Sequence, residues 1–168
     1  MKENVNNVIK ILFVCHGNIC RSTMAEFVMK WKVKNLGVAD RFHIESAATS
    51  TEELGSPVYP GTRRALDRHG VDVDYSKKRA RQITLDDYER FDYLVGMDSA
   101  NLGNMRRLFA KKIDKAPSKL YRLLDFTDRP GDISDPWYHD NFELTFSEVD
   151  AGCDGLLKHC LGSGRNSD

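Results

Sequence analysis

The sequence predicts an α/β protein, folded as a three-layer α/β/α sandwich around a four-stranded parallel sheet. Short β-rich runs alternate with helical patterns, which implies right-handed crossovers between parallel strands and a helical layer on each face. The first run, residues 8–14 (VIKILFV), is almost entirely apolar, as in a strand that is buried on both faces. The length of 168 residues suits a single domain over 1–168 with a sizeable core.

The elements that follow the first strand have recognisable boundaries. Residues 22–36 form a predicted helix, which a capping box of Thr23 and Glu26 starts and Gly37 ends. Residues 41–47 (RFHIESA) alternate in the way that is typical of a strand.

The middle of the chain continues this alternation of helices and strands. Residues 61–69 have a helical pattern that Gly70 closes, and Thr84 begins a short capped helix over 84–91. The run DYLVGM at 92–97 is the predicted third strand.

The last third of the chain completes the sheet. Ser99 is expected to cap a helix that ends near residue 110, and residues 118–124 (SKLYRLL) form the predicted fourth strand. A polar loop follows over 125–138, and a final helix over 141–160. Ligands of such sheets bind beyond the C-terminal ends of the strands, so the turn after the first strand lies where a site is expected.

Composition narrows the classes of function. The 25 Lys and Arg residues balance the 25 Asp and Glu residues, so no overall charge favours nucleic acid or a membrane as a partner. The N-terminal apolar run is too short to span a bilayer and does not resemble a signal peptide. Four cysteines without a CxxC pair are typical of a protein in a reducing cytoplasm. We also expect the two ends of the chain, residues 1–7 and 161–168, to be mobile.

The segment CHGNICRS, residues 15–22, carries the predicted chemistry. A turn that leads into a helix points backbone N–H groups at its centre, and the helix dipole adds positive charge. Gly17 allows close approach of the backbone and Asn18 tolerates left-handed dihedrals, so the turn can form a nest for a tetrahedral oxyanion. Arg21 can hold two oxygens of that anion, and the same donors would stabilise a thiolate at Cys15. We therefore predict a phosphate-binding loop that also supplies the nucleophile.

Two other interpretations of this segment are weaker. A metal site would need a second pair of His or Cys ligands, and His16 would point away from the neighbouring cysteine. No GK[ST] motif indicates a nucleotide-binding loop. We therefore expect neither a metal nor another cofactor.

A phosphocysteine mechanism also needs a general acid, which would later act as a base. The loop DFTDRPGDISDPWYHD offers the candidates Asp125, Asp128, Asp132, Asp135 and Asp140. Asp135 is distinctive because Pro136 restricts its backbone. The aromatic residues that follow, Trp137 and Tyr138, could wall a flat substrate, yet residue chemistry alone leaves the choice of acid open.

Six motifs resemble, in family order, those of low-molecular-weight protein tyrosine phosphatases. They are VCHGNICRSTMAE at 14–26, SAATS at 46–50, RHG at 68–70, ARQIT at 80–84, MDSAN at 97–101 and DPWY at 135–138. The match extends from about residue 8 to about residue 160. The chain is thus similar to that family over nearly all of its length.

The resemblance implies metal-independent hydrolysis of phosphotyrosine through a phosphocysteine intermediate. It implies that Cys15 is the nucleophile, Arg21 the phosphate clamp and Asp135 the general acid and later the base. Ser22 matches the hydroxyl that stabilises the departing thiolate. The implied partners are phosphotyrosine proteins or small aryl phosphates, with phosphate, vanadate or sulfate as competing anions, and we expect a monomer or weak dimer.

The resemblance also implies roles around the loop. His16, Gly17, Asn18, Ile19 and Cys20 belong to the phosphate-binding loop, and Trp137 and Tyr138 to the pocket wall. Asn18 and Ser46 match residues that brace the loop, and Cys20 matches a thiol that can form a reversible disulfide with Cys15 under peroxide. Asp98 and Asn101, just after the third strand, are expected to support the pocket edge or to cap the next helix.

The chain departs from the family pattern at two positions. Glu52 stands at the pocket rim where many members have an aromatic residue, which would favour substrates with basic flanks. Lys78 stands where many members have a loop-bracing histidine, and we expect Lys77 and Lys78 to be solvated.

Three alternatives remain open at this point. Arsenate reductases with this loop need a second reactive cysteine pair, but Cys153 and Cys160 would lie about 10.5 Å apart along one apolar helix face, and we predict core thiols. Protein-arginine phosphatases of the family carry threonine in place of Ile19, whose apolar side chain suits an aromatic ring better. A binding module without turnover would not need nucleophile, clamp and acid together.

Overall fold

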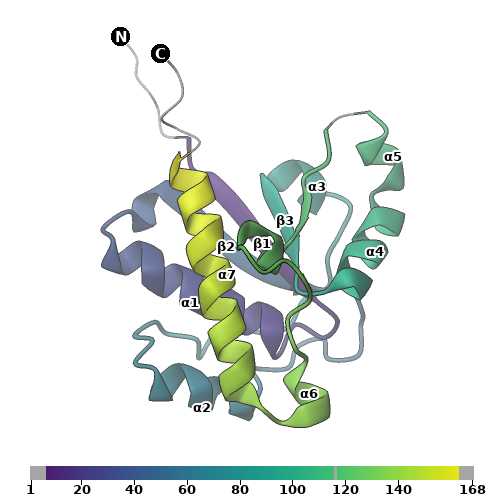
Figure 1. Cartoon of the computed structure of the whole chain (residues 1–168). Coiled ribbons are helices and arrows are strands. Elements are labelled where there is room, and N and C mark those ends of the chain that lie inside the picture. Colours follow the sequence, from purple (N-terminus) through teal and green to yellow (C-terminus); the bar gives the residue numbers. More distant parts are fainter. Residues whose placement is uncertain (1–6, 116, 163–168) are drawn as a thin grey trace.

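Within residues 7–115 and 117–162, which the computed structural model describes, four parallel strands form one sheet (Figure 1). The order across the sheet is β2-β1-β3-β4, and the strands are β1 Ile9–Cys15, β2 Phe42–Ala48, β3 Tyr93–Gly96 and β4 Leu120–Arg122. All three neighbouring pairs are parallel. The predicted fold class is confirmed, although β4 is shorter than predicted because the chain turns into a 3₁₀ helix at Leu123.

Helices cover both faces of this sheet (Figure 1). One side carries α1 Arg21–Asn35, α2 Pro60–Arg68 and α7 Phe142–Gly162. The other side carries α3 Asp87–Arg90, α4 Ser99–Leu108 and α5 Ala110–Ile113. The remaining helical segments are short, namely the 3₁₀ helices Ala39–Arg41 and Leu123–Phe126 and the helix α6 Pro136–His139.

Strand β1 joins the two hydrophobic cores because its side chains alternate between them. Ile11 and Phe13 belong to the core that α1 and α7 share, whereas Leu12 and Val14 belong to the core beneath α4. All four side chains are fully buried, as the apolar run in the sequence predicted. The strand ends at Cys15, so the loop that follows is anchored to the most buried strand of the sheet.

The start of α1 shows that the predicted capping box is wrong. The helix begins at Arg21, directly after the loop, and Thr23 lies inside its first turn. The Thr23 hydroxyl donates to the carbonyl oxygens of Ile19 at 2.8 Å and Cys20 at 2.9 Å, so it tightens the loop and does not cap the helix. The end of the helix is as predicted, with Gly37 at φ +73°.

Three further helix starts differ from the prediction. Helix α3 begins at Asp87 and not at Thr84, whose N–H and hydroxyl donate to Asp87 Oδ2 at 2.8 Å and 3.3 Å. Asp98, and not Ser99, caps α4, and Asn101 completes a capping box with it. The segment 125–138, predicted to be a loop, includes the beginning of α6. The differences at α4 and α6 place a carboxylate at a helix N-terminus close to the end of β1, which matters for the site described below.

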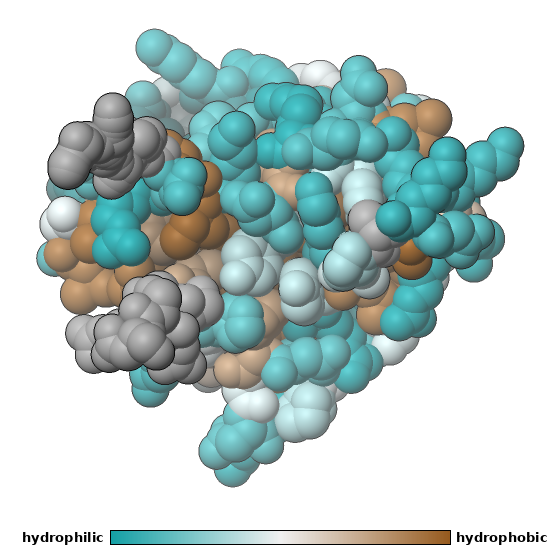
Figure 2. Space-filling view, turned by 90° about the horizontal axis from the view of Figure 1, so that it is seen from above, coloured by the Kyte–Doolittle hydropathy of each residue, from teal (hydrophilic) through white to brown (hydrophobic). Residues whose placement is uncertain are grey.

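The C-terminal helix is longer than predicted. It continues through Gly162, whereas the sequence pattern predicted its end at residue 160. Of the two ends that were predicted to be mobile, residues 1–6 and 163–168 lie outside the described residues. Among the described helices, none combines the length and apolar character that crossing a membrane requires. Seen from above, hydrophilic side chains cover most of the surface and hydrophobic residues are confined to smaller patches (Figure 2).

Gly155 marks a close approach between α7 and the segment after β4. A Cβ atom at this position would overlap the carbonyl oxygen of Phe126. We therefore expect Gly155→Ala to push α7 away and to lower the free energy of unfolding, measured by urea denaturation, by about 1–3 kcal/mol. Gly103→Ala in α4 is the control: its Cβ would meet only Arg107 Nη1 at 3.8 Å, so helix propensity should raise stability by up to about 1 kcal/mol. A loss of equal size in both variants would contradict the packing argument.

Candidate active site

A cleft of about 510 Å³ opens at the C-terminal end of β1. Most of the predicted site residues line it, namely Cys15, His16, Gly17, Ile19, Cys20, Arg21, Asp98, Asp135, Trp137 and Tyr138. Glu52, expected at the pocket rim, and Asn101, expected at the pocket edge or in a helix cap, also line the cleft, whereas no feature of the sequence indicated a pocket-lining role for Glu53, Ala100 and Asn104. The remaining predicted residues are buried, namely Asn18 of the loop, Ser22 at the start of α1 and Ser46 of β2. The structure thus brings together side chains from the first loop, the start of α4 and the start of α6.

The loop holds the Cys15 sulfur among hydrogen-bonding groups. Asn18 adopts a left-handed backbone with φ +60°, and its N–H donates to Cys15 Sγ at 3.3 Å. The Cys15 thiol lies 3.0 Å from Ser22 Oγ, which also accepts a hydrogen bond from Asn18 Nδ2 at 2.8 Å. The Ser22 hydroxyl hydrogen is therefore available to the sulfur once Cys15 has lost its proton.

Arg21 lies at the base of the cleft with a side chain that is only 4% exposed. Its Nη1 donates to Asp98 Oδ2 at 2.8 Å and to the Ile133 carbonyl at 3.0 Å, and its Nη2 donates to Asp135 Oδ2 at 3.4 Å. Burial acts against its charge, but Cys15, Asp98 and Asp135 together raise the pKa of the Arg21 guanidinium above its ordinary value. The Nε hydrogen and the second hydrogen of Nη2 remain for two oxygens of a bound anion.

The structure distinguishes Asp135 from the other candidate acids, because it is the one of the five that lines this cleft within the described ranges. Its side chain caps α6, where its Oδ1 accepts the N–H of Trp137 at 3.1 Å, and its Oδ2 faces Arg21. Asp125 and Asp132 instead pair with Arg122, at 3.0 Å and 2.9 Å. In the sequence only Pro136 and the aromatic residues after Asp135, together with the DPWY motif, distinguished it, because its place in the cleft depends on the position of α6.

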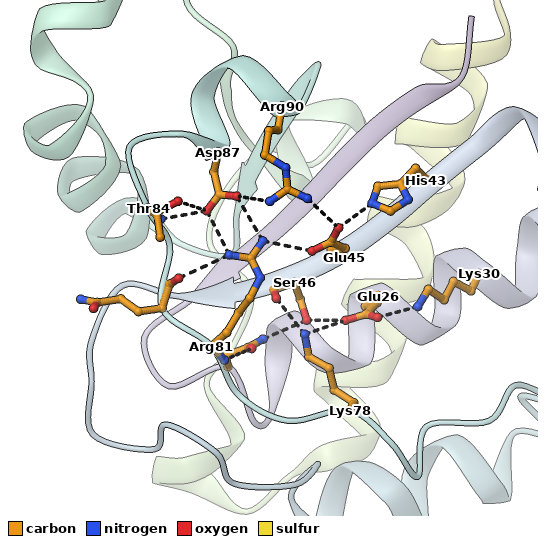
Figure 3. A network of polar contacts seen from close by, with 12 residues as sticks. Glu26, Lys30, His43, Glu45, Ser46, Lys78, Arg81, Thr84, Asp87 and Arg90 are labelled. Carbon is orange, nitrogen blue, oxygen red and sulfur yellow. Dashed lines mark hydrogen bonds and ion pairs between the residues drawn. The ribbon is translucent and has the colours of Figure 1, made fainter. Parts of the chain in front are cut away.

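A buried polar network supports the loop from below (Figure 3). Asn18 Nδ2 donates to Ser46 Oγ at 2.8 Å, and Ser46 Oγ donates to Glu26 Oε1 at 2.5 Å. Lys78 Nζ donates to the Ser46 carbonyl at 2.8 Å and lies 3.3 Å from Glu26 Oε1. Burial lowers the pKa of Lys78, although Glu26 acts in the opposite direction. The prediction that Lys78 is solvated is therefore wrong: it forms a largely buried ion pair under the loop.

Arg81 ties the loop to the other face of the sheet, and the sequence reasoning missed this role. Its backbone N–H donates to Asn18 Oδ1 at 3.1 Å. Its guanidinium forms two hydrogen bonds with the fully buried Asp87, at 3.0 Å and 3.2 Å, and one with Glu45 at 3.1 Å. Only its place in the ARQIT motif pointed to this position, because Asn18 and Glu45 come from distant segments and Asp87 lies six residues further on, in α3 (Figure 3).

The four cysteines differ in their surroundings. Burial, reinforced by Cys15 and Asp135, raises the pKa of Cys20 to about 12, so this residue remains a thiol at neutral pH. Cys153 and Cys160 lie in the core on α7, as predicted, and burial raises the pKa of both. Among the described residues no cysteine forms a disulfide, and no group of three or more His, Cys, Asp or Glu side chains could hold a metal ion.

The comparisons with known proteins agree with one another. A family model for low molecular weight phosphotyrosine protein phosphatases matches residues 10–164. The low molecular weight protein-tyrosine-phosphatase YfkJ of Bacillus subtilis is 36% identical over 152 residues, which cover 89% of this chain and 94% of that protein. The crystal structure of YfkJ matches with a TM-score of 0.87 at 33% identity, covering 94% of this chain and 98% of that one.

Two further solved structures are similar. The low molecular weight protein tyrosine phosphatase SP-PTP of Streptococcus pyogenes has 40% identity and a TM-score of 0.77, and the match covers 90% of this chain and 93% of that one. The drosophila arginine phosphatase DARP has 27% identity and a TM-score of 0.82, with 95% and 99% covered. The family match extends over most of the chain, as the sequence motifs implied, and the chain belongs to the low molecular weight phosphotyrosine protein phosphatase family.

Proposed function

We propose that this protein is a metal-independent phosphotyrosine phosphatase that acts through a phosphocysteine on Cys15. The observation that carries the proposal is the meeting of Cys15, Arg21 and Asp135 in one cleft, with the Asn18 N–H directed at the Cys15 sulfur. Family membership supports the same activity. Each of the three residues supplies a different requirement of phosphoryl transfer, namely a nucleophile, a clamp for the charged oxygens and a proton donor.

In the first step the Cys15 thiolate attacks the phosphorus atom. The S–P bond forms while the bond from phosphorus to the phenolic oxygen breaks, and protonated Asp135 gives its proton to that oxygen. The two free N–H groups of Arg21 bind two phosphoryl oxygens, and the backbone N–H groups of the loop surround the anion. Asp98 and the Ile133 carbonyl keep the guanidinium in place, because they occupy Nη1 and not the two free donors.

In the second step water releases phosphate from the cysteine. Asp135, now ionised, accepts a proton from water as the water oxygen attacks phosphorus, and the P–S bond breaks. The thiolate that leaves is stabilised by the Asn18 N–H and by the Ser22 hydroxyl. The protonated acid is thereby restored for the next cycle.

The shape of the cleft favours an aromatic leaving group. Ile19 contributes an apolar side chain beside the loop, and Trp137 and Tyr138 contribute aromatic rings. These surfaces suit the ring of phosphotyrosine in proteins or of small aryl phosphates, with phosphate, vanadate or sulfate as competitors. Arginine phosphatase activity is the second candidate, because the arginine phosphatase DARP shares the fold; the apolar Ile19 argues for tyrosine.

The proposal also includes a reducing cytoplasm and redox control. Peroxide would oxidise the Cys15 thiolate to a sulfenic acid, and the Cys20 thiol would then displace water to form a disulfide. Cys20 lines the same cleft as Cys15 and stays protonated at neutral pH, so it does not compete as nucleophile.

The first prediction concerns the nucleophile. The purified protein should hydrolyse para-nitrophenyl phosphate in excess EDTA, because no step uses a metal. Cys15→Ser should lower kcat to background while vanadate still binds, measured by calorimetry. Complete dependence on added metal, or turnover by Cys15→Ser, would exclude the cysteine mechanism. A parallel assay with phosphoarginine tests the second candidate activity.

The second prediction concerns the general acid. Asp135→Asn keeps an oxygen that can cap α6 but cannot transfer the proton, so kcat/KM should fall about 10²- to 10⁴-fold for phenyl phosphate. The fall should be much smaller for aryl phosphates with strongly acidic phenols, because their oxygen needs no proton. Asp132→Asn is the control and should leave both rates near the parent values. A loss independent of the leaving group would argue against the acid role.

The third prediction concerns the buried support. Lys78→Met removes the charge that faces buried Glu26, and the loosened loop should lower kcat/KM about ten- to hundredfold. Lys77→Met, at an exposed neighbouring position, should leave kcat/KM unchanged. Combining Lys78→Met with Glu26→Gln should cost less than the sum of the single changes, because the buried negative charge that Lys78 faces is removed with it. Strict additivity would show that the two side chains do not act as a pair.

The fourth prediction concerns oxidation. Thiol treatment should restore the activity of peroxide-treated protein, whereas Cys20→Ala should recover much less because Cys15 is overoxidised without a partner thiol. Cys153→Ala, changed in the core, should recover as the parent does. Equal recovery by the Cys20→Ala variant would remove Cys20 from this role.

A further inference from the structure

Two carboxylates at the cleft have no part in the proposed chemistry. Glu52 and Glu53 line the cleft from the segment after β2. The Glu52 side chain is 69% exposed, and its partner is His16 at 2.8 Å, which carries a charge only when protonated. Glu53 accepts a hydrogen bond from the Ser56 hydroxyl at 3.0 Å and lies over the loop, since a Cβ on Gly17 would be 3.5 Å from Glu53 Cγ.

The cleft therefore carries more negative than positive charge. Asp98 and Asp135 both face the single guanidinium of Arg21, and Asp98 alone offsets its charge while Asp135 holds the proton that it donates in the proposed first step. Glu52 and Glu53 add two negative charges, and no Lys or Arg among the described residues forms an ion pair with either. A phosphoryl dianion bound near Arg21 makes this imbalance larger. A positive charge on the substrate, outside the phosphate site, would reduce it.

Exposed aromatic rings line the same cleft. Trp137 is 58% exposed and Tyr138 is 85% exposed. Trp137 is held edge-on against Tyr59 at 5.5 Å, and Tyr59 stacks on Phe142 at 5.8 Å. Aromatic faces attract ammonium and guanidinium groups, so these rings strengthen the electrostatic attraction of Glu52 and Glu53 for a cation.

We propose that Glu52 and Glu53, together with Trp137 and Tyr138, form a subsite for a lysine or arginine side chain close to the phosphotyrosine of a substrate protein. The inference rests on the proposed phosphatase function and specifies its substrate class, namely phosphotyrosine in a basic sequence context. Since Glu52, Trp137 and Tyr138 are exposed, each charge contact is screened by solvent, and the selection is a severalfold preference. It decreases with ionic strength, because salt screens exposed charges.

The test is a matrix of enzyme variants and phosphotyrosine peptides. Three peptides differ only in carrying Lys, Ala or Glu on both sides of phosphotyrosine. The value of kcat/KM is measured for each peptide at low salt and at about 0.5 M salt, where exposed charges are strongly screened. The parent should hydrolyse the Lys peptide about tenfold faster than the Glu peptide at low salt. This ratio should shrink at high salt. Para-nitrophenyl phosphate has no flanking residues, so its hydrolysis measures the activity of the phosphate site alone.

The variants change the charge of the cleft in steps. Glu52→Gln and Glu53→Gln should each lower the Lys-to-Glu ratio about two- to fivefold, and Glu52→Lys should lower it further. Asp40→Lys is the matched control, because Asp40 is exposed just before the start of β2, at the opposite end of the sheet from the cleft. Asp40→Lys makes the same change in net charge as Glu52→Lys and should leave the Lys-to-Glu ratio of kcat/KM at the parent value.

The outcomes separate the two proposals. Failure to hydrolyse any of the peptides or para-nitrophenyl phosphate would remove the phosphatase function itself. Hydrolysis of all three peptides at equal rates would leave that function intact and overturn the cation subsite. A ratio that falls equally in Glu52→Lys and Asp40→Lys would also overturn it, because the preference would then arise from net charge.

Discussion

Asn18 makes hydrogen bonds to three separate segments of the chain, and the shape of the loop depends on them. Its backbone N–H is directed at Cys15, its Nδ2 at Ser22 and Ser46, and its Oδ1 accepts from the backbone of Arg81. The left-handed backbone at φ +60° is what aims these groups, and asparagine adopts it more readily than most residues. Because its backbone N–H and both atoms of its side-chain amide are occupied, the position of the sulfur is set jointly by the loop, β2 and the backbone at Arg81.

The ion pair of Glu26 and Lys78 extends this constraint into the protein interior. Removing two charges from water is unfavourable, so such a pair contributes little to stability compared with an apolar pair of similar size. Its value lies in geometry: Glu26 fixes the Ser46 hydroxyl while Lys78 fixes the Ser46 carbonyl. Lys30 satisfies the second oxygen of Glu26 at 2.6 Å, so the carboxylate has no freedom to turn away.

The fold and the centre of the site could be predicted because their signals are local. The apolar run of β1, the loop directly after it and the apolar face of α7 each lie within one short stretch of sequence. The capping box at Thr23 was wrong because the same residue types also suit a hydroxyl that binds the carbonyls of the preceding turn. The solvated interpretation of Lys78 was wrong because its partners are Glu26 and Ser46, which no pattern around residue 78 reveals. Contacts between distant segments leave no local signal.

The two departures from the family pattern have different physical consequences because they differ in burial. Lys78 lies under the loop, where it holds the Ser46 carbonyl, so in the proposed mechanism a change there affects every substrate alike. Glu52 lies at the exposed edge of the cleft, where it contacts His16 and leaves the groups around the sulfur untouched. A change at the exposed edge can alter which sequences are preferred while the buried base keeps its geometry. The chemistry is thus held by buried hydrogen bonds from several segments, and the choice of substrate by exposed charges and rings that can vary independently of it.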